Sequence, residues 1–335
     1  MRDDDVRGAV VWAAWAARRE EPSVGRTWIP LDGSSTTAPE APVRTSADVA
    51  HAIVEASVVV DDAAIDAALG AAVGSAMSWQ EPDAEDDLAS SPDVVAAMLP
   101  IAERIAASGH WLHAGRAPGS WLVRWDETPP RPPIDLRAAR DAAHAEDEAM
   151  RAHALDAPGP PLTGSWWSTP QTPETVGRLP IALDLVEDEL GWRGATAVAV
   201  REPERLLRID SASAWVALAR AHPLETTFAR RHDWGRATGE QHRWIVPDWA
   251  AVAEHHDAVH LDVRCWLEGA GRALPLDDER ATVIAGWSPD ATVRLHEPIP
   301  LDAHRPRRFE RDEGDAWVEV DAARQGLSRR RSPPG

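Results

Sequence analysis

Two proline clusters, at 129–133 and 158–161, place the strongest constraint on how this chain can fold. Proline has no backbone N–H and its ring blocks the preceding turn, so neither cluster can continue a helix or a central strand. We therefore expect the clusters to flank a polar helix at about 136–155 and to separate two regions. The predicted division is a mainly helical region at 1–128, Pro-rich linkers at 129–163, a mixed domain at 164–303 and a partly disordered tail at 304–335.

The region before the first cluster shows the apolar spacing of helices. Ser91 is placed to cap one of them, with Pro92 at the first helical position. Short strands are expected at 110–112 and 121–125. The predicted helices are 6–19, 46–56, 61–79 and 91–107.

After residue 164 the apolar residues follow a mixture of strand and helix periods. Ser211 and Asp248 are suitable caps for helices at 211–221 and 248–256. This mixture predicts an α+β fold for the chain. The expected strands are 195–201, 205–209, 259–263, 281–287 and 292–295.

Composition limits both the core and the partners. The chain has no Tyr and two Phe but 17 Trp, so Trp must supply most of the aromatic core, and Trp166, Trp215 and Trp287 are predicted to be buried. The formal net charge of −20 opposes binding to nucleic acid. No apolar run is long enough for a membrane span. An acidic N-terminus and a single cysteine, Cys265, favour a cytoplasmic protein.

One segment, 230–244, reverses the sign of the molecule, because four arginines outnumber one Asp and one Glu. Gly235 and Gly239 suggest a loop that brings backbone close to a ligand. We interpret the segment as a site for a small anionic molecule such as a nucleotide; the alternative is that its arginines pair with surface carboxylates. The candidate catalytic residues are His232, Asp233 and His260, and the candidate ligand-binding residues are Arg231, Trp234, Arg236, Arg243 and Trp244.

Two other kinds of site are possible for residues of the same region. A metal could be held by His255 or His256 with Asp257 and His260, but the spacing fits no established metal motif, so no metal site is predicted. A Cys265–His260 nucleophile pair is the second kind of site. The alternative is packing, because a lone cysteine followed by Trp266 and Leu267 is typical of an inert small apolar residue. No particular cofactor is indicated by the sequence.

The stretch at about 164–295 resembles a family of actinobacterial proteins of unknown function. The residues that carry the resemblance are Gly164-Ser165-Trp166-Trp167-Ser168, Leu185-Val186-Glu187-Asp188, Arg231-His232-Asp233-Trp234, Pro247 to Ala253, Asp257 to Leu261 and Ala285 to Asp290. The resemblance names a family without implying an activity.

A more distant likeness is carried by a strand that ends Trp166-Trp167-Ser168, a strand–helix unit at 206–221 and an Asp248-Trp249 helix that leads to the strand with His260. These elements resemble parts of small ADP-ribosyltransferase-like domains. Glu187-Asp188-Glu189 has the Glu-x-Glu form of one branch of that superfamily, and Arg208 and Ser211-Ala212-Ser213 are similar to its Arg and Ser-Thr-Ser motifs. Here the acidic motif precedes the other two in the chain, opposite to the order in that branch. The branch that uses a His, Tyr and Glu triad is not matched, because the chain has no Tyr.

From these patterns we expect an α+β domain that binds or transforms a small anionic molecule. The alternative is a protein-interaction module whose Trp-rich surface docks a protein partner, since Trp and Arg are common at binding hot spots. Trp234, Trp244 and Trp249 would converge on a pocket in the first case and form an exposed apolar patch in the second.

Overall fold

The computed structural model describes residues 45–56, 58–82, 84–117, 119–129, 132–151, 165–187 and 191–320. The helix expected at 6–19 lies outside these residues. The architecture is α+β, as the sequence predicts. The chain divides into two compact units, one of residues 1–72 and 82–110 and the other of residues 73–81 and 111–335. The Pro-rich region expected to separate two domains therefore falls within the second unit.

The described part of the first unit is helical. Its elements are α2 (Ser46–Glu55), most of α3 (Asp62–Gly74), α4 (Ala84–Ala89) and α5 (Pro92–Ala107). Thr45 caps α2 through a reciprocal pair of hydrogen bonds with Asp48, which satisfies N–H groups that a helix start leaves free. Helix α2 packs against α5, and Ile53, Val94 and Met98 are buried in this unit.

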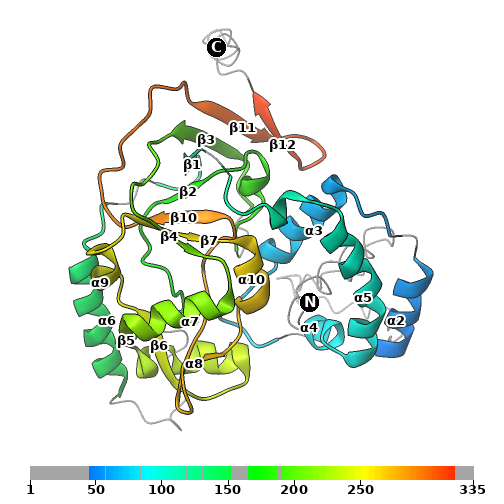
Figure 1. The fold of residues 1–335 in the computed structure, drawn as a ribbon, viewed down its shortest axis with the longest axis horizontal. Coiled ribbons are helices and arrows are strands. Elements are labelled where there is room, and N and C mark those ends of the chain that lie inside the picture. The colour runs from blue at the N-terminus through cyan, green and yellow to red at the C-terminus, as the bar shows by residue number, and fades with distance from the viewer. Residues whose placement is uncertain are drawn as a thin grey trace, which may run out of the picture. The chain divides into compact units, whose positions relative to one another are not determined.

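The second unit is built on a mixed sheet that, within the described residues, has the strand order β12-β11-β3-β1-β2-β10-β7-β4 (Figure 1). Strands β4 and β7 run parallel, whereas the other described neighbours are antiparallel. The strands are β1 (Trp121–Trp125), β2 (Glu174–Val176), β3 (Gly194–Ala199), β4 (Leu206–Ile209), β7 (Ala258–Leu261), β10 (Ala291–Arg294), β11 (Arg307–Arg311) and β12 (Trp317–Val320).

A smaller sheet has the order β5-β6-β9-β8. Helix α7 follows β4 and helix α10 follows β7, and these two helices pack against each other (Figure 1). The further elements are β5 (Pro223–Glu225), β6 (Arg243–Pro247), β8 (Leu274–Pro275), β9 (Arg280–Thr282), α6 (Leu136–Arg151), α7 (Ala212–Ala221), α8 (Thr227–Thr238), α9 (Trp249–Ala253), α10 (Val263–Gly269) and the 3-10 turns η1 (Trp111–His113) and η2 (Ile181–Leu183).

Three parts of the chain are placed differently from the sequence-based division. Strand β1, expected within the helical region, pairs with β2 and β3 of the main sheet. Strands β11 and β12, in the expected tail, form a hairpin whose Phe309 and Trp317 are buried in the core. Helix α6, expected between linkers, packs against α8 and α9. Contacts between residues far apart in sequence decide all three placements.

The tryptophans form much of the core of the second unit. Trp215 and Trp287 are fully buried and meet edge to face with centroids 5.8 Å apart, so both predicted core positions are confirmed. Trp166 is partly buried and packs against the cluster that contains Trp234 and Trp244. No helix among the described residues is long and apolar enough to span a membrane.

Candidate functional site: a charged pocket at the ends of two parallel strands

One face of the main sheet carries an unusual row of polar side chains. Arg208 on β4 pairs in register with His260 on β7, and His260 pairs with Thr292 on β10. Because directly paired residues point to the same side of a sheet, these three side chains share a face. Val259 and Val293, which point the other way, are fully buried in the apolar core. Strand alternation thus separates a polar face from an apolar one.

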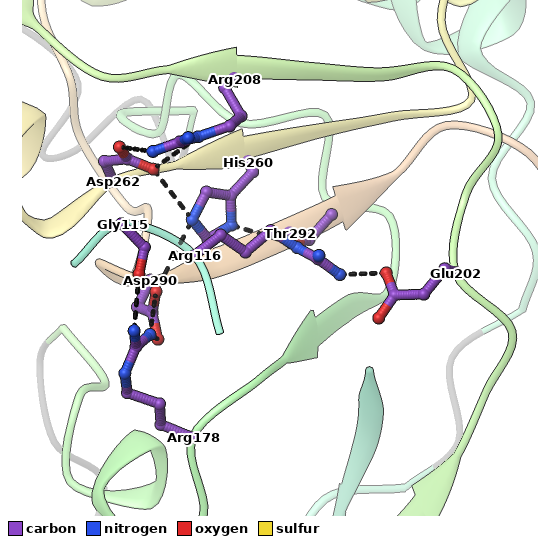
Figure 2. Close-up of polar contacts among 9 residues, drawn as sticks. All are labelled: Gly115, Arg116, Arg178, Glu202, Arg208, His260, Asp262, Asp290 and Thr292. Carbon is purple, nitrogen blue, oxygen red and sulfur yellow. Dashed lines mark hydrogen bonds and ion pairs between the residues drawn. The ribbon is translucent and has the colours of Figure 1, made fainter. Parts of the chain in front are cut away.

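His260 lies at the centre of this polar face (Figure 2). Its Nδ1 atom is 3.0 Å from the hydroxyl of Thr292. Its Nε2 atom is 3.1 Å from Oδ1 of Asp262 and 3.6 Å from Oδ1 of Asp290, and the imidazole is fully buried. Two carboxylates therefore face one ring nitrogen, which selects the tautomer that carries a proton on Nε2.

Each of the two carboxylates also has its own guanidinium (Figure 2). Arg178 donates from Nη1 to both carboxylate oxygens of Asp290, at 3.0 and 2.8 Å. Arg208 donates to Asp262 from Nε, at 3.3 Å, and from Nη2. Buried carboxylates are stable only when paired and hydrogen-bonded, and these contacts meet that requirement.

The environments of the two carboxyl groups move their pKa values apart. Burial acts to raise the pKa of Asp262, but the contacts with His260 and Arg208 outweigh it and bring that pKa below its usual value. Burial raises the pKa of Asp290 above its usual value, although Arg178 and His260 oppose the change. The hydrogen bond to Asp262 raises the pKa of Arg208. Asp262 and Arg208 are therefore fixed as an ion pair around neutral pH.

The segment from Trp111 to Ala117 covers the polar face. The backbone carbonyl of Gly115 accepts a hydrogen bond of 2.6 Å from Nη2 of Arg178, whose guanidinium also lies 4.5 Å from the ring centroid of Trp111. Arg116 forms an ion pair with Glu202 (Figure 2). Gly115 has φ +70°, and a Cβ there would lie 2.6 Å from Nη2 of Arg208. The positive φ favours glycine here, and any larger residue would require the end of the Arg208 side chain to shift.

A pocket of about 610 Å³ opens where this segment meets the carboxyl ends of β4 and β7. Such a position, where parallel strands end and helices begin, is the usual ligand crevice of sheets with parallel strands. Asp262 is 9% exposed, whereas the Arg208 side chain is 48% exposed and reaches the opening. The lining residues are Leu112, His113, Ala114, Gly115, Arg208, Asp210, Ser211, Asp262 and Arg264.

The start of α7 forms one wall of the pocket. Ser211 caps this helix by accepting a hydrogen bond from the N–H of Ala214. The N–H of Ala212 donates to the carboxylate of Glu268 at 2.9 Å, and Glu268 also pairs with Arg264 at 3.0 Å. A carboxylate thus already occupies the positive end of the helix, so this end is not where a ligand anion would sit.

The sequence-predicted catalytic residues are not brought together. His260 lies in the polar network described above, but His232 and Asp233 lie on α8, which packs against α6 and β6. His232 has its Nε2 atom 3.4 Å from Nη1 of Arg236, and Asp233 is fully buried. A catalytic set of these three residues is not what the structure forms.

Trp234 and Trp244 cannot stack on a ligand as the sequence suggested, because both are fully buried. Their rings meet edge to face with centroids 5.5 Å apart, and Nε1 of Trp234 donates to the carbonyl of Trp166 at 2.6 Å. Trp249 is also buried. None of the three lines the pocket or forms an exposed patch, so they do not provide the docking surface of the alternative hypothesis either.

The segment 230–244 is mainly helix, whereas the sequence suggested a loop. This is why Trp234 and Trp244 are buried and do not face a ligand. Gly235 lies inside α8, where a Cβ would meet Nε2 of Gln241 at 2.4 Å, and Gly239 ends the helix with φ +70°. The two glycines therefore serve a close packing contact and a helix C-terminus.

The basic side chains of this segment are engaged by other parts of the chain. Arg243 pairs with Glu225 at 2.6 Å and with Glu279 at 3.5 Å, and Arg236 pairs with Glu81 at 3.3 Å. Arg231 has its guanidinium 5.3 Å from the ring centroid of Phe228. The pairing of arginines with surface carboxylates, which was the alternative interpretation of the sequence, is what the structure shows for Arg236 and Arg243.

Several residues of the pocket and of the polar network behind it were not singled out from the sequence as site residues. Asp210 and Asp262 each follow the end of a strand and precede a helix, which is a signal that could have found them. Asp290 has φ +58°, an uncommon conformation for a residue other than glycine. Arg178 and Gly115 carried no such signal, because only the tertiary fold brings them to the sheet.

Two other kinds of site were considered for this region, a metal site and a cysteine nucleophile. No group of three or more His, Cys, Asp or Glu side chains in the described part of the chain could hold a metal ion. Cys265 is buried within α10, and burial raises the pKa of its thiol well above the usual value. A thiolate nucleophile at this position is disfavoured.

Fold and site together define an α+β protein with a charged pocket at the ends of two parallel strands. Comparison with known proteins found no matching family model, no matching curated protein and no matching solved structure. The resemblances to the actinobacterial family and to ADP-ribosyltransferase-like domains stay predictions. Arg208 and Ser211, on which part of the second resemblance rests, both line the pocket.

Proposed function

We propose that this chain binds a small molecule through an anionic group, a carboxylate or a phosphate, in the pocket at the ends of β4 and β7. The observation that carries the proposal is the state of Arg208. Its Nε and Nη2 atoms are held by Asp262, whereas no hydrogen bond from Nη1 is formed within the described residues. A guanidinium that is already fixed by one carboxylate presents its remaining donors to a second anion with little further loss of entropy.

The dimensions of the pocket agree with this proposal. A volume of about 610 Å³ lies within the range of roughly 300–1,000 Å³ that is common for small-molecule sites. A second arginine, Arg264, lines the same opening. The pocket is therefore large enough for a metabolite-sized ligand and has two guanidinium groups at its surface.

The electrostatics favour binding over proton transfer. The lowered pKa of Asp262 and the raised pKa of Arg208 keep both groups charged near neutral pH, so neither is adjusted to exchange a proton there. His260 is fully buried behind Asp262 and does not line the pocket. In this arrangement His260 orients Asp262, which in turn orients Arg208.

A thermal-shift screen followed by calorimetry tests the proposal. The panel contains acetate, oxalate, citrate, inorganic phosphate, mononucleotides, dinucleotides and the proteinogenic amino acids. Compounds that raise the melting temperature are titrated into the wild type, Arg208→Gln and Arg243→Gln. Arg243 is a matched control, because it is also half exposed and ion-paired but lies on β6 in the segment that the sequence favoured.

Arg208→Gln is expected to bind the compound at least tenfold more weakly than the wild type. Arg243→Gln is expected to bind it with unchanged affinity. Loss of binding in Arg243→Gln with full binding in Arg208→Gln would mean that the ligand site lies in the segment 230–244. No binding by the wild type would refute the proposal. Should Arg208→Gln fail to fold, Arg208→Lys provides the second test, since it keeps a positive charge beside Asp262 but removes the Nη1 donor.

A further inference from the structure

Besides the positively charged Arg208, the pocket has a negatively charged group that could contact a ligand, the carboxylate of Asp210. Asp210 follows the last residue of β4, two positions after Arg208, so the alternation of the strand brings both side chains toward the same opening. The residue is exposed, and its carboxylate accepts a hydrogen bond of 3.2 Å from the neutral hydroxyl of Ser211. Within the described residues, no cation forms an ion pair with it.

The other charges of the pocket are already matched. Asp262 is held by Arg208 and His260, and Arg264 is paired with Glu268, which also satisfies the first turn of α7. The groups that remain for a ligand are Nη1 of Arg208, which is a donor, and the carboxylate of Asp210, which is an acceptor. A ligand that satisfies both must carry an anionic group and a cationic or strongly donating group close together.

The charge of the pocket and the net charge of the whole chain both favour a ligand that carries no net charge. The pocket is lined by two arginines and two aspartates, so a purely anionic ligand would meet repulsion from Asp210. The formal net charge of −20 also repels anions at long range, whereas a molecule with no net charge is not repelled.

We infer that the ligand of this pocket is a small zwitterion of the amino-acid class, with its carboxylate on Arg208 and its ammonium group on Asp210. The inference rests on the proposed function and narrows it. It assigns Asp210 as the residue that separates amino acids from the corresponding acids without an ammonium group, through an ion pair with the ammonium group that those acids lack.

The experiment compares matched pairs of ligands by calorimetry. Each proteinogenic L-amino acid is titrated beside the 2-hydroxy acid in which a hydroxyl replaces the ammonium group. The wild type is expected to bind at least one amino acid about tenfold more tightly than its hydroxy acid, because the hydroxyl can donate to Asp210 but carries no positive charge to pair with it. Asp210→Asn should bind the two within about threefold of each other, whereas Arg208→Gln should weaken both.

Asp278→Asn is the control, because it removes one negative charge from an exposed position that does not line the pocket. It should keep the wild-type preference. Equal binding of hydroxy acid and amino acid by the wild type would overturn the zwitterion inference and leave the proposed anion site standing. An unchanged preference in Asp210→Asn would overturn it in the same way. Failure of every compound to bind would overturn both.

Discussion

Gly115 lies against the guanidinium of Arg208 and has no side chain that would displace it. Its backbone is left-handed, with φ +70°. A methyl group at Gly115 would lie 2.6 Å from Nη2 of Arg208, so either the segment Trp111–Ala117 or the guanidinium must move. The position of one glycine thus sets the geometry of the proposed anion site.

Replacing Gly115 with Ala should therefore weaken ligand binding beyond its effect on stability. The left-handed conformation alone should cost about 1–2 kcal/mol of unfolding free energy. Gly239→Ala is the matched control, because Gly239 also has φ +70° but a Cβ there would meet nothing within 4 Å. Denaturant unfolding should show similar losses for both variants, and calorimetry with the best compound of the panel should show weaker binding for Gly115→Ala. Equal affinities in the two variants would contradict this role of Gly115.

A second residue, Glu187, should make stability depend on pH. Its carboxylate oxygens accept hydrogen bonds from Nε1 of Trp266 at 2.8 Å and from the N–H of Gly286 at 2.6 Å. Burial nevertheless dominates and raises the pKa of Glu187 from 4.5 to about 8. Between these two values the unfolded chain is ionised at this position and the folded chain is protonated. The folded state therefore binds the extra proton, and stability should fall as pH rises from about 4.5 to 8.

Glu187→Gln removes this titration. The variant should be less stable than the wild type at pH 5, because its amide nitrogen faces an N–H donor, and the difference should shrink steadily toward pH 9. Chemical denaturation at pH values from 5 to 9 measures the trend. In Glu319→Gln, the control, the difference should stay constant over this range, since the hydrogen bond from Arg307 lowers the pKa of Glu319. A constant offset for Glu187→Gln as well would contradict the raised pKa.

At the scale of elements, helix α8 depends on another helix for its start. Thr226 precedes α8 without a capping hydrogen bond from its side chain. The carboxylate of Asp147 on α6 instead accepts from the N–H groups of Phe228, at 2.7 Å, and Ala229, at 3.0 Å. Asp147 is buried, so α6 supplies the cap that the local sequence of α8 lacks.

The replacement Asp147→Ala should cost about 1–2 kcal/mol, the usual range for loss of a helix cap in a protein. Asp141→Ala on the same helix is the control, because its side chain is 70% exposed and pairs only with Arg140 among the described residues. It should change stability by less than about 0.5 kcal/mol. Urea unfolding of both variants decides the matter, and equal midpoints would show that α6 does not cap α8.

The elements that could be predicted from the sequence are those with local signals. Residues 121–125 form β1 as expected, α7 begins after its Ser211 cap, and α5 begins at Pro92. Helix α8 could not be predicted, because its cap comes from residue 147 and its internal Gly235 reads as a loop signal. The hairpin of β11 and β12 is stabilised by pairing with β3, which lies more than a hundred residues earlier.

In the candidate site, too, only the residues with a local signal could be predicted from the sequence. His260, a catalytic candidate from the sequence, lies in the polar network next to Asp262. The basic segment 230–244 drew attention because charge composition is visible in a sequence, whereas the pairing of those charges is not. Arg178 and Asp290 are 112 residues apart and meet only through the folded sheet.

For the molecule as a whole, we propose that the ligand site lies at the ends of β4 and β7 and not in the basic segment 230–244. Both regions belong to the second unit, so a probe that reports on backbone position by position can compare them within one sample. Binding reduces local opening of the hydrogen-bonded backbone that it contacts, which slows amide exchange there.

Hydrogen–deuterium exchange with mass spectrometry makes this comparison most directly. The protein is labelled with and without a saturating amount of the panel compound that gives the largest thermal shift. We expect slower exchange in peptides that cover 111–117, 206–214 and 262–266, with little change over 227–244. Slower exchange confined to 227–244, with the three pocket segments unchanged, would contradict the proposed site.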